Sequence, residues 1–284
     1  MSLSFIDDRG SLRPGWKTLG FILLVLSLGD LLALVRSTTG LAWLRGPWAG
    51  ALVGVGASLL CVRLEGRSFS SLGFLPGTRW LKDCALGALS GLALALIIAM
   101  LVRGMDGFHW QRAPAVGTRQ LLAGAWLLLG VSLSEEILFR GFPFQRLVEG
   151  LGPWVGQLTC AALFTWVHWA NPGMQGATRA WASMNISLLG ILLGFCYLRT
   201  RSLALPVGLH FGWNWAQGSL LGFGVSGTTE FKGAWTPVFH GRPEWLTGGS
   251  FGLEASLPCA LVCSVAVLAM WRWKGRPASG TRAE

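Results

Sequence analysis

Charged residues are scarce in this chain, since Asp, Glu, Lys and Arg make up only 13% of its 284 residues. An average soluble domain is about a quarter charged. The six cysteines show no CxxC spacing, so neither a disulfide framework nor a structural zinc site is indicated. Tyrosine occurs once, against 16 tryptophans. The shortage of charge excludes an ordinary soluble domain and directs attention to the apolar residues, which form 52% of the chain.

Long apolar stretches recur along the whole sequence. A stretch of about 17 residues or more can cross a hydrocarbon core about 30 Å thick. The candidate spans lie at roughly 18–35, 46–62, 84–102, 120–148, 154–170, 183–199, 203–221 and 253–271. Tryptophans near span ends, such as Trp16, Trp80 and Trp271, are typical of the membrane interface. The sequence therefore predicts an all-α fold, a polytopic transmembrane bundle of about eight helices.

The net charge of +10 does not indicate nucleic-acid binding, because the basic residues are spread over the loops of a membrane protein. Lys and Arg are more frequent in the loops on the side of the N-terminus. By the positive-inside rule, this bias predicts a multi-pass integral membrane protein with both termini in the cytoplasm. A compact chain rich in Gly and Arg, without an organelle signal, is typical of bacteria, so we expect the bacterial inner membrane.

The chain is expected to form one membrane domain with no appended soluble domain. Its longer polar stretches are 63–82, 103–119 and 222–252. The last of these is rich in Gly, Thr and Pro and is long enough to be a lid over a site. An outer loop without a role is the simpler interpretation.

The fourth span carries charges that lipid would not tolerate. Glu135 and Glu136 are adjacent and point about 100° apart on a helix, and Arg140 follows Glu136 by four residues, in position for an ion pair. One acid can therefore be paired while the other stays free. Ionisable residues inside membranes are costly and usually functional, although simple neutralisation of Arg140 is an alternative. Pro143 is expected to bend or end this helix.

The fifth span contains His168 within the sequence FTWVHWANP. Glu135 and His168 are equidistant from a predicted turn at 150–153, so an antiparallel hairpin would place them at nearly the same membrane depth. A lone histidine in an apolar helix is most often a satisfied core residue. A histidine level with two carboxylates favours a shared site.

The seventh span, beginning LALPVGLHFGWNWAQG, places His210 and Asn214 four residues apart and thus on one helical face. Two polar groups on one face of an apolar helix indicate a common partner. However, His210 lies much nearer the start of its span than His168 does. Either the helix starts irregularly around Pro206 and Gly208, or the predicted boundary is misplaced.

Together these residues form three motifs in order: EExxxR from Glu135, FxxxH from Phe164 and HxxxN from His210. In these motifs the chain resembles the CPBP family of intramembrane proteases, which includes the CAAX prenyl endopeptidases of the Rce1 type. The resemblance covers about 120–223, the expected catalytic core. Residues 1–119 are expected to hold membrane helices that resemble the family only weakly. Within them, the segment SFSSLGF at 68–74 shows a weak resemblance. Residues 224–284 are expected to hold an outer loop, the last transmembrane helix and a basic tail.

The resemblance implies an enzyme that hydrolyses a peptide bond of a membrane-embedded or membrane-anchored peptide. The site residues that it implies are catalytic Glu135, Glu136, His168, His210 and Asn214, supported by Arg140 and Phe164. In a glutamate-type arrangement without metal, Glu135 and His168 activate water while His210 and Asn214 stabilise the oxyanion. In a metalloendopeptidase arrangement, His168, His210 and Glu135 bind a catalytic zinc with water in the fourth position. The spacing is not that of HExxH, so the sequence does not require zinc and leaves both arrangements open.

Two other functions compete with proteolysis. A non-catalytic membrane scaffold, or a peptide-toxin immunity protein of the same fold, would be expected to lose an acid or a histidine, and this chain keeps them all. A transporter would be expected to show internal repeats, which the sequence lacks. No role in the site is expected for the remaining polar residues His109, His240, Asn185 and Asp30.

Overall fold

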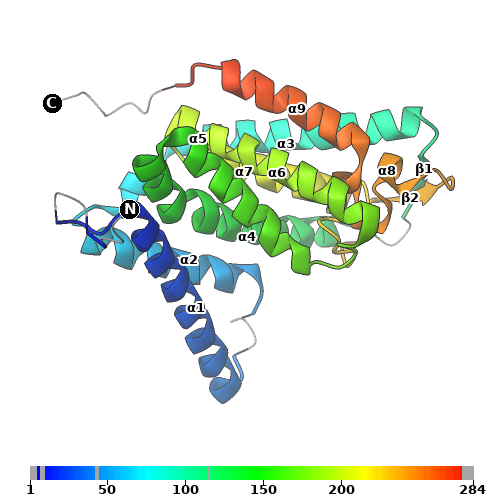
Figure 1. The fold of residues 1–284 in the computed structure, drawn as a ribbon. Helices are drawn as coiled ribbons and strands as arrows, with labels where there is room; N and C mark the ends of the chain where they lie inside the picture. The colour runs from blue at the N-terminus through cyan, green and yellow to red at the C-terminus, as the bar shows by residue number, and fades with distance from the viewer. Residues whose placement is uncertain (1–4, 7–9, 42–44, 114–115, 277–284) are drawn as a thin grey trace.

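The computed structural model describes residues 5–6, 10–41, 45–113 and 116–276, which fold into a bundle of helices (Figure 1). The long helices are α1 (Pro14–Thr39), α2 (Pro47–Leu64), α3 (Thr78–Gly104), α4 (Thr118–Arg140), α5 (Phe142–Val167), α6 (Gly176–Thr200) and α9 (Leu257–Arg272). The shorter elements are α7 (Ala204–Trp215), which continues into a π-helical turn (Ala216–Leu220), and α8 (Glu244–Thr247). Strands β1 (Phe108–Arg112) and β2 (Trp235–Phe239) pair antiparallel at one end of the bundle.

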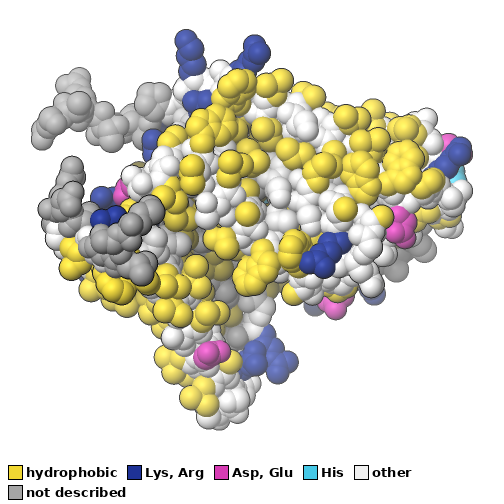
Figure 2. All heavy atoms as spheres, in the orientation of Figure 1, with side chains coloured by type: hydrophobic (Ala, Val, Ile, Leu, Met, Phe, Trp, Pro, Cys, Tyr) yellow, Lys and Arg dark blue, Asp and Glu magenta, His cyan; other side chains and the backbone are white. Residues whose placement is uncertain are grey.

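The prediction of an all-α membrane bundle is confirmed, and each predicted span overlaps at least one helix. Within the described residues, five segments are long and apolar enough to cross a membrane. They are Pro14–Thr39, Pro47–Leu64, Thr78–Gly104, Thr118–Ala170 and Gly176–Thr200. Hydrophobic side chains cover much of the face drawn in Figure 2, as expected of a surface in contact with lipid. The chain is an integral membrane protein.

The predicted fourth span, 120–148, is wrong at its C-terminal end. Helix α4 ends at Arg140, and α5 starts at Phe142 with Pro143 in its first turn. Proline lacks the N–H that a continuing helix needs, but its fixed φ suits the first turn of a new one. A second break occurs at Gly152, within the predicted turn, where a φ of 80° is readily adopted only by glycine.

Helix α7 begins inside the bundle, and this explains the position of His210 near the start of its span. All residues in 203–210 are buried. The segment 68–74 packs against the start of the helix, where the Gly73 carbonyl accepts a hydrogen bond from the Leu203 N–H at 3.0 Å. The helix is regular from Ala204 to Trp215, so the predicted start of the span agrees with the helix, and neither an irregular start around Pro206 and Gly208 nor a misplaced boundary is needed.

Glycines bring α7 into close contact with α3. A Cβ added at Gly91 would lie 2.1 Å from the Leu209 carbonyl oxygen, and one at Gly212 would lie 2.0 Å from that of Ala88. Real Cβ atoms do not approach other atoms so closely, so only glycine fits at either position. Small residues at such contacts let backbones meet where lipid supplies no hydrophobic drive. The α3–α7 contact therefore fixes the helix that carries His210.

Helix α1 makes fewer contacts with the bundle than the other long helices make. It runs obliquely beneath the bundle in Figure 1 and packs on α2 and α5. Its large apolar side chains, such as Leu23, Leu26 and Leu34, are exposed, and so is Asp30. The start of α1 and the end of α9 lie at the same end of the bundle, opposite the two-stranded β1–β2 sheet.

Polar side chains next to the two-stranded β1–β2 sheet join the loop after α3 to the loop after β2. The Asp106 carboxylate accepts hydrogen bonds from His240 Nδ1 at 2.7 Å and from Arg242 Nη2 at 2.9 Å. Both hydrogen bonds lower the pKa of Asp106. His240 Nε2 lies 2.7 Å from His109 Nδ1. His109 of β1 and His240 of the loop after β2 thus link these two segments at the surface.

The close contact at Gly91 makes a stability prediction. Gly91→Ala should lower the free energy of unfolding by about 1–3 kcal/mol, because the added methyl group forces α3 away from α7. Thermal unfolding in detergent measures the loss. Gly29→Ala in α1 is the matched control, since a Cβ there meets nothing within 4 Å. Equal melting temperatures for the two variants would contradict the prediction.

Candidate active site

Four predicted site residues border one small cavity between α5, α6 and α7. They are Phe164, His168, His210 and Asn214. The other polar side chains in its wall belong to Ser226 and Glu254, and the remaining wall is apolar: Ile186, Leu189, Leu193, Leu209 and Trp213. The cavity volume of about 20 Å³ is enough for a water molecule.

Glu136 is fully buried and is held by one partner on its own helix and one on α7. Its Oε1 accepts a hydrogen bond from Arg140 Nη1 at 3.1 Å, so the predicted i,i+4 ion pair is present. Arg140 also donates from Nη2 to the Gly190 carbonyl of α6 at 3.1 Å. His210 Nδ1 of α7 lies 2.8 Å from the same Glu136 oxygen. Because a carboxylate only accepts, Nδ1 carries the proton in this contact.

Glu135 faces the other nitrogen of the same histidine. Its Oε2 lies 3.7 Å from His210 Nε2 and has no hydrogen-bond partner among the described residues. This separation is too long for a direct hydrogen bond, and a water molecule beside both atoms could join them. The Glu135 side chain is 26% exposed, whereas that of Glu136 is 0% exposed. The side chain of the paired acid is therefore completely buried, whereas that of the other acid is partly exposed, although its Oε2 atom is buried.

Phe164 connects the acid pair to His168. Its ring lies 4.6 Å from the Arg140 guanidinium carbon, 4.5 Å from the His168 ring and 6.2 Å from the His210 ring. His168 Nδ1 donates to the Phe164 carbonyl at 2.7 Å, so its Nε2 is left to face a ligand. His168 shares no hydrogen bond with Glu135 in the described structure.

Asn214 lies one helical turn beyond His210, as its spacing predicted. Its side chain is 4% exposed and lines the cavity. No hydrogen bond joins the Asn214 side-chain amide to any of the described residues. Buried amides are normally hydrogen-bonded, so this group is available to a ligand or a water in the cavity.

The expected zinc ligands do not form a metal site. In the part of the chain that the structure describes, no three His, Cys, Asp or Glu side chains are grouped so that they could hold a metal ion. His210 and Glu135 lie close together, but His168 does not join them. Catalytic zinc sites have three protein ligands, and this geometry supplies fewer.

Glu254 was not among the predicted site residues, although it lies in the cavity wall and is 2% exposed. It immediately precedes α9, and a single acid at the start of the last apolar stretch was the signal available in the sequence. Asn185, for which no role was expected, holds the backbone there. Its amide donates to the carbonyls of Glu254 at 2.7 Å and of Ser256 at 2.9 Å.

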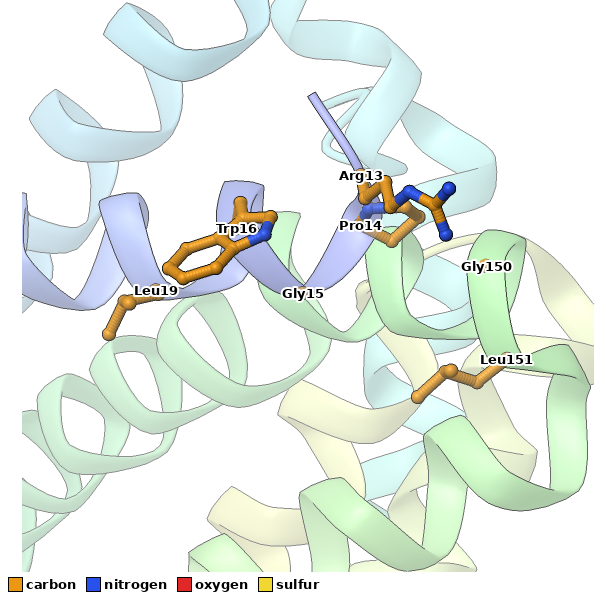
Figure 3. A pocket seen from close by; sticks show the side chains of 7 residues that line it. All are labelled: Arg13, Pro14, Gly15, Trp16, Leu19, Gly150 and Leu151. Atoms are coloured by element: carbon orange, nitrogen blue, oxygen red, sulfur yellow. The ribbon is translucent and has the colours of Figure 1, made fainter. Parts of the chain in front are cut away.

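A much wider groove of about 640 Å³ lies where α1 begins beside the break in α5 (Figure 3). Its lining residues are Arg13, Pro14, Gly15, Trp16, Leu19, Gly150 and Leu151. None of these lining residues is an acid, a histidine or a nucleophile, so the size of the groove does not make it a candidate for the reaction. The chemistry is concentrated in the small cavity instead.

The structure thus defines a membrane bundle in which two histidines and a free amide line one small cavity, and a buried acid–arginine pair contacts one of these histidines. A family model described as "Type II CAAX prenyl endopeptidase Rce1-like" matches residues 117–216. This match confirms the resemblance inferred from the EExxxR, FxxxH and HxxxN motifs, all of which lie within it. A comparison with curated proteins finds no match.

The buried ion pair makes a second stability prediction. Arg140→Met should lower the free energy of unfolding by about 3–5 kcal/mol, because it leaves a buried carboxylate without its cation. Adding Glu136→Gln should recover part of this loss, so the double variant should be more stable than the sum of the single effects implies. Thermal unfolding of the four proteins in detergent measures the coupling. The control Arg119→Met, at an exposed arginine of the same helix, should change stability by less than about 0.5 kcal/mol.

Proposed function

We propose that the chain is an intramembrane endopeptidase that hydrolyses a peptide bond of a membrane-embedded or membrane-anchored substrate. The proposal is carried by the meeting of three motifs around His210, beside a free Glu135 oxygen and a cavity that accepts water. The match to a family of CAAX prenyl endopeptidases supports the same reaction class.

Glu135 is the proposed general base. Its side chain is partly exposed and has no arginine partner among the described residues, whereas Glu136 is fully buried and paired with Arg140. Glu135 takes a proton from a water molecule, and the water oxygen attacks the carbonyl carbon of the substrate. His168 Nε2, which faces away from the Phe164 carbonyl, accepts the second hydrogen bond of this water and orients it.

Asn214 and His210 are the proposed donors to the oxyanion. The Asn214 amide is free in the cavity, and His210 Nε2 donates when it carries a proton. Collapse of the tetrahedral intermediate breaks the carbon–nitrogen bond, and the proton held by Glu135 passes to the leaving amine. Glu136, Arg140 and Phe164 support these groups by holding the His210 ring in place.

The finer features of the proposal follow from the same site and from the charge pattern. The reaction is assigned to side chains alone, of the glutamate type, because the zinc ligands do not converge. The excess of basic residues on the side of the termini supports an orientation with both termini in the cytoplasm. The compact chain rich in Gly and Arg supports the bacterial inner membrane. The catalytic core is assigned to 120–223.

Glu135→Gln should lower the rate of peptide cleavage by about 10²–10⁴-fold, because the amide cannot accept the proton of the attacking water. The full-length protein would be reconstituted in liposomes with two internally quenched probes. One is a prenylated peptide that ends in Cys-aliphatic-aliphatic-X, and the other is a peptide with a single membrane span. Product formation would be followed by fluorescence and mass spectrometry.

The matched control is Glu230→Gln, the same change at an exposed acid in the outer loop, which should cleave like wild type. Equal cleavage by Glu135→Gln and wild type would overturn the assignment of Glu135. Absence of cleavage of both probes by wild type would favour the alternative function, a non-catalytic scaffold or immunity protein of the same fold.

The metal-free assignment predicts that a chelator leaves cleavage unchanged. Purified protein would be treated with 1,10-phenanthroline, assayed on the probe that it cleaves, and analysed for bound metal by mass spectrometry. Loss of activity that added zinc restores would show that His168, His210 and Glu135 rearrange around an ion during the reaction.

A further inference from the structure

The buried Glu254 carboxylate is unusual because it is surrounded by neutral donors. Its Oε1 accepts hydrogen bonds from Trp213 Nε1 at 2.8 Å and from Gln217 Nε2 at 3.3 Å. Its Oε2 accepts from the Ser226 backbone N–H at 2.8 Å and from the Ser226 hydroxyl at 2.7 Å. Four donors from two separate parts of the chain therefore meet on one side chain.

One of these parts is a tight turn in the loop that follows α7. Val225 and Thr228 pair across it, and Ser226 at its corner has a φ of 47°. This left-handed conformation is disfavoured for residues other than glycine, so the surrounding contacts must hold it. Besides Glu254, the Asn171 amide holds the turn by donating to the Ser226 carbonyl at 2.9 Å. The turn 225–228 thus forms the part of the cavity wall that lies in this loop.

The other part is the C-terminal end of α7. Trp213 and Gln217 are one turn apart, on either side of Asn214 in the sequence, and Gln217 lies in the π-helical turn. By binding both side chains, Glu254 fixes the rotation of α7 at the level of the free Asn214 amide. Asn185 in turn fixes the backbone of Glu254.

From these contacts we infer that Glu254 is a positioning residue of the active site, which latches the turn 225–228 over the cavity and holds Asn214 in register with it. The inference rests on the proposed function of this cavity. A charged group buried among neutral partners costs more than an apolar or amide side chain would, so packing alone does not account for a glutamate here. The loop 222–252 was expected to lack a role. Under this inference, its turn 225–228 is part of the site.

Hydrogen exchange tests the latch without any need for a substrate. In Glu254→Gln, one carboxylate oxygen is replaced by an NH₂ group, which cannot accept hydrogen bonds from the donors around it. The contacts that hold the turn should therefore weaken. The backbone amides of 225–228 should exchange about tenfold faster than in wild type, as expected for the loss of a charge-assisted hydrogen bond. The measurement uses the detergent-solubilised full chain and mass spectrometry. Glu244→Gln, at an exposed acid of the same loop, should exchange like wild type.

Amides of α3 report whether the variant is folded, since they should not change. If Glu254→Gln exposes them, Ser226→Ala replaces it as the test, because that variant removes only the hydroxyl bond to Glu254. Its turn amides should exchange faster by a smaller factor than in Glu254→Gln. Unchanged exchange in the turn of a folded variant would overturn the latch.

Kinetics test whether the latch acts through Asn214. On the prenylated peptide probe, Glu254→Gln should lower kcat by about tenfold or more, with a smaller change in KM, because oxyanion stabilisation acts in the transition state. In an Asn214→Ala background the same change should have little further effect on kcat. Independent, multiplicative effects of the two substitutions would overturn a positioning role.

The two proposals fail in different ways. If wild type cleaves the probe and Glu254→Gln matches it in kcat and in turn exchange, the role of Glu254 is refuted while the protease function stands. If wild type cleaves no probe, the protease function is refuted, and the exchange measurement alone decides whether Glu254 latches the turn.

Discussion

A carboxylate that is completely buried in an apolar bundle has to be paired, and the arrangement of this site follows from the way Glu136 is paired. Arg140 reaches it from the next turn of α4, and His210 reaches it from α7. Because Arg140 also binds the Gly190 carbonyl, one buried charge joins α4, α6 and α7. The same pairing leaves the neighbouring Glu135 free, so two adjacent and chemically identical side chains differ in what they can do. One holds the helices together, and the other makes no hydrogen bond to the described residues.

His210 lies between the two acids and contacts both of them. His210 uses Nδ1 to bind the fixed acid, and this contact turns Nε2 toward the free acid and the cavity. Phe164 packs against the guanidinium of Arg140 and both histidine rings, so the orientation of each ring depends on the ion pair beneath it. Loss of the pair would therefore disturb the reactive groups as well as the packing of the bundle.

The sequence allowed the local features of this protein to be predicted, because they depend on residues a few positions apart. The apolar stretches predicted the helices, the spacing of Glu136 and Arg140 predicted their ion pair, and Pro143 predicted the end of α4. Contacts between distant segments could not be predicted in this way. The latch between Glu254 and Ser226, and the packing of segment 68–74 against the start of α7, join residues that no periodicity relates. The sequence also could not predict whether the possible zinc ligands lie close together, because this depends on how each helix is rotated about its axis.

The burial of residues 203–210 at the start of α7 bears on the order in which the protein can be assembled during synthesis. A helix in lipid is normally stable by itself before it packs against others. The first turns of α7 instead need α3 and the segment 68–74 as their surroundings, and both are made well before α7 leaves the ribosome. The N-terminal third of the chain, which lies outside the matched segment, therefore acts as a template on which the histidine-bearing helix is placed.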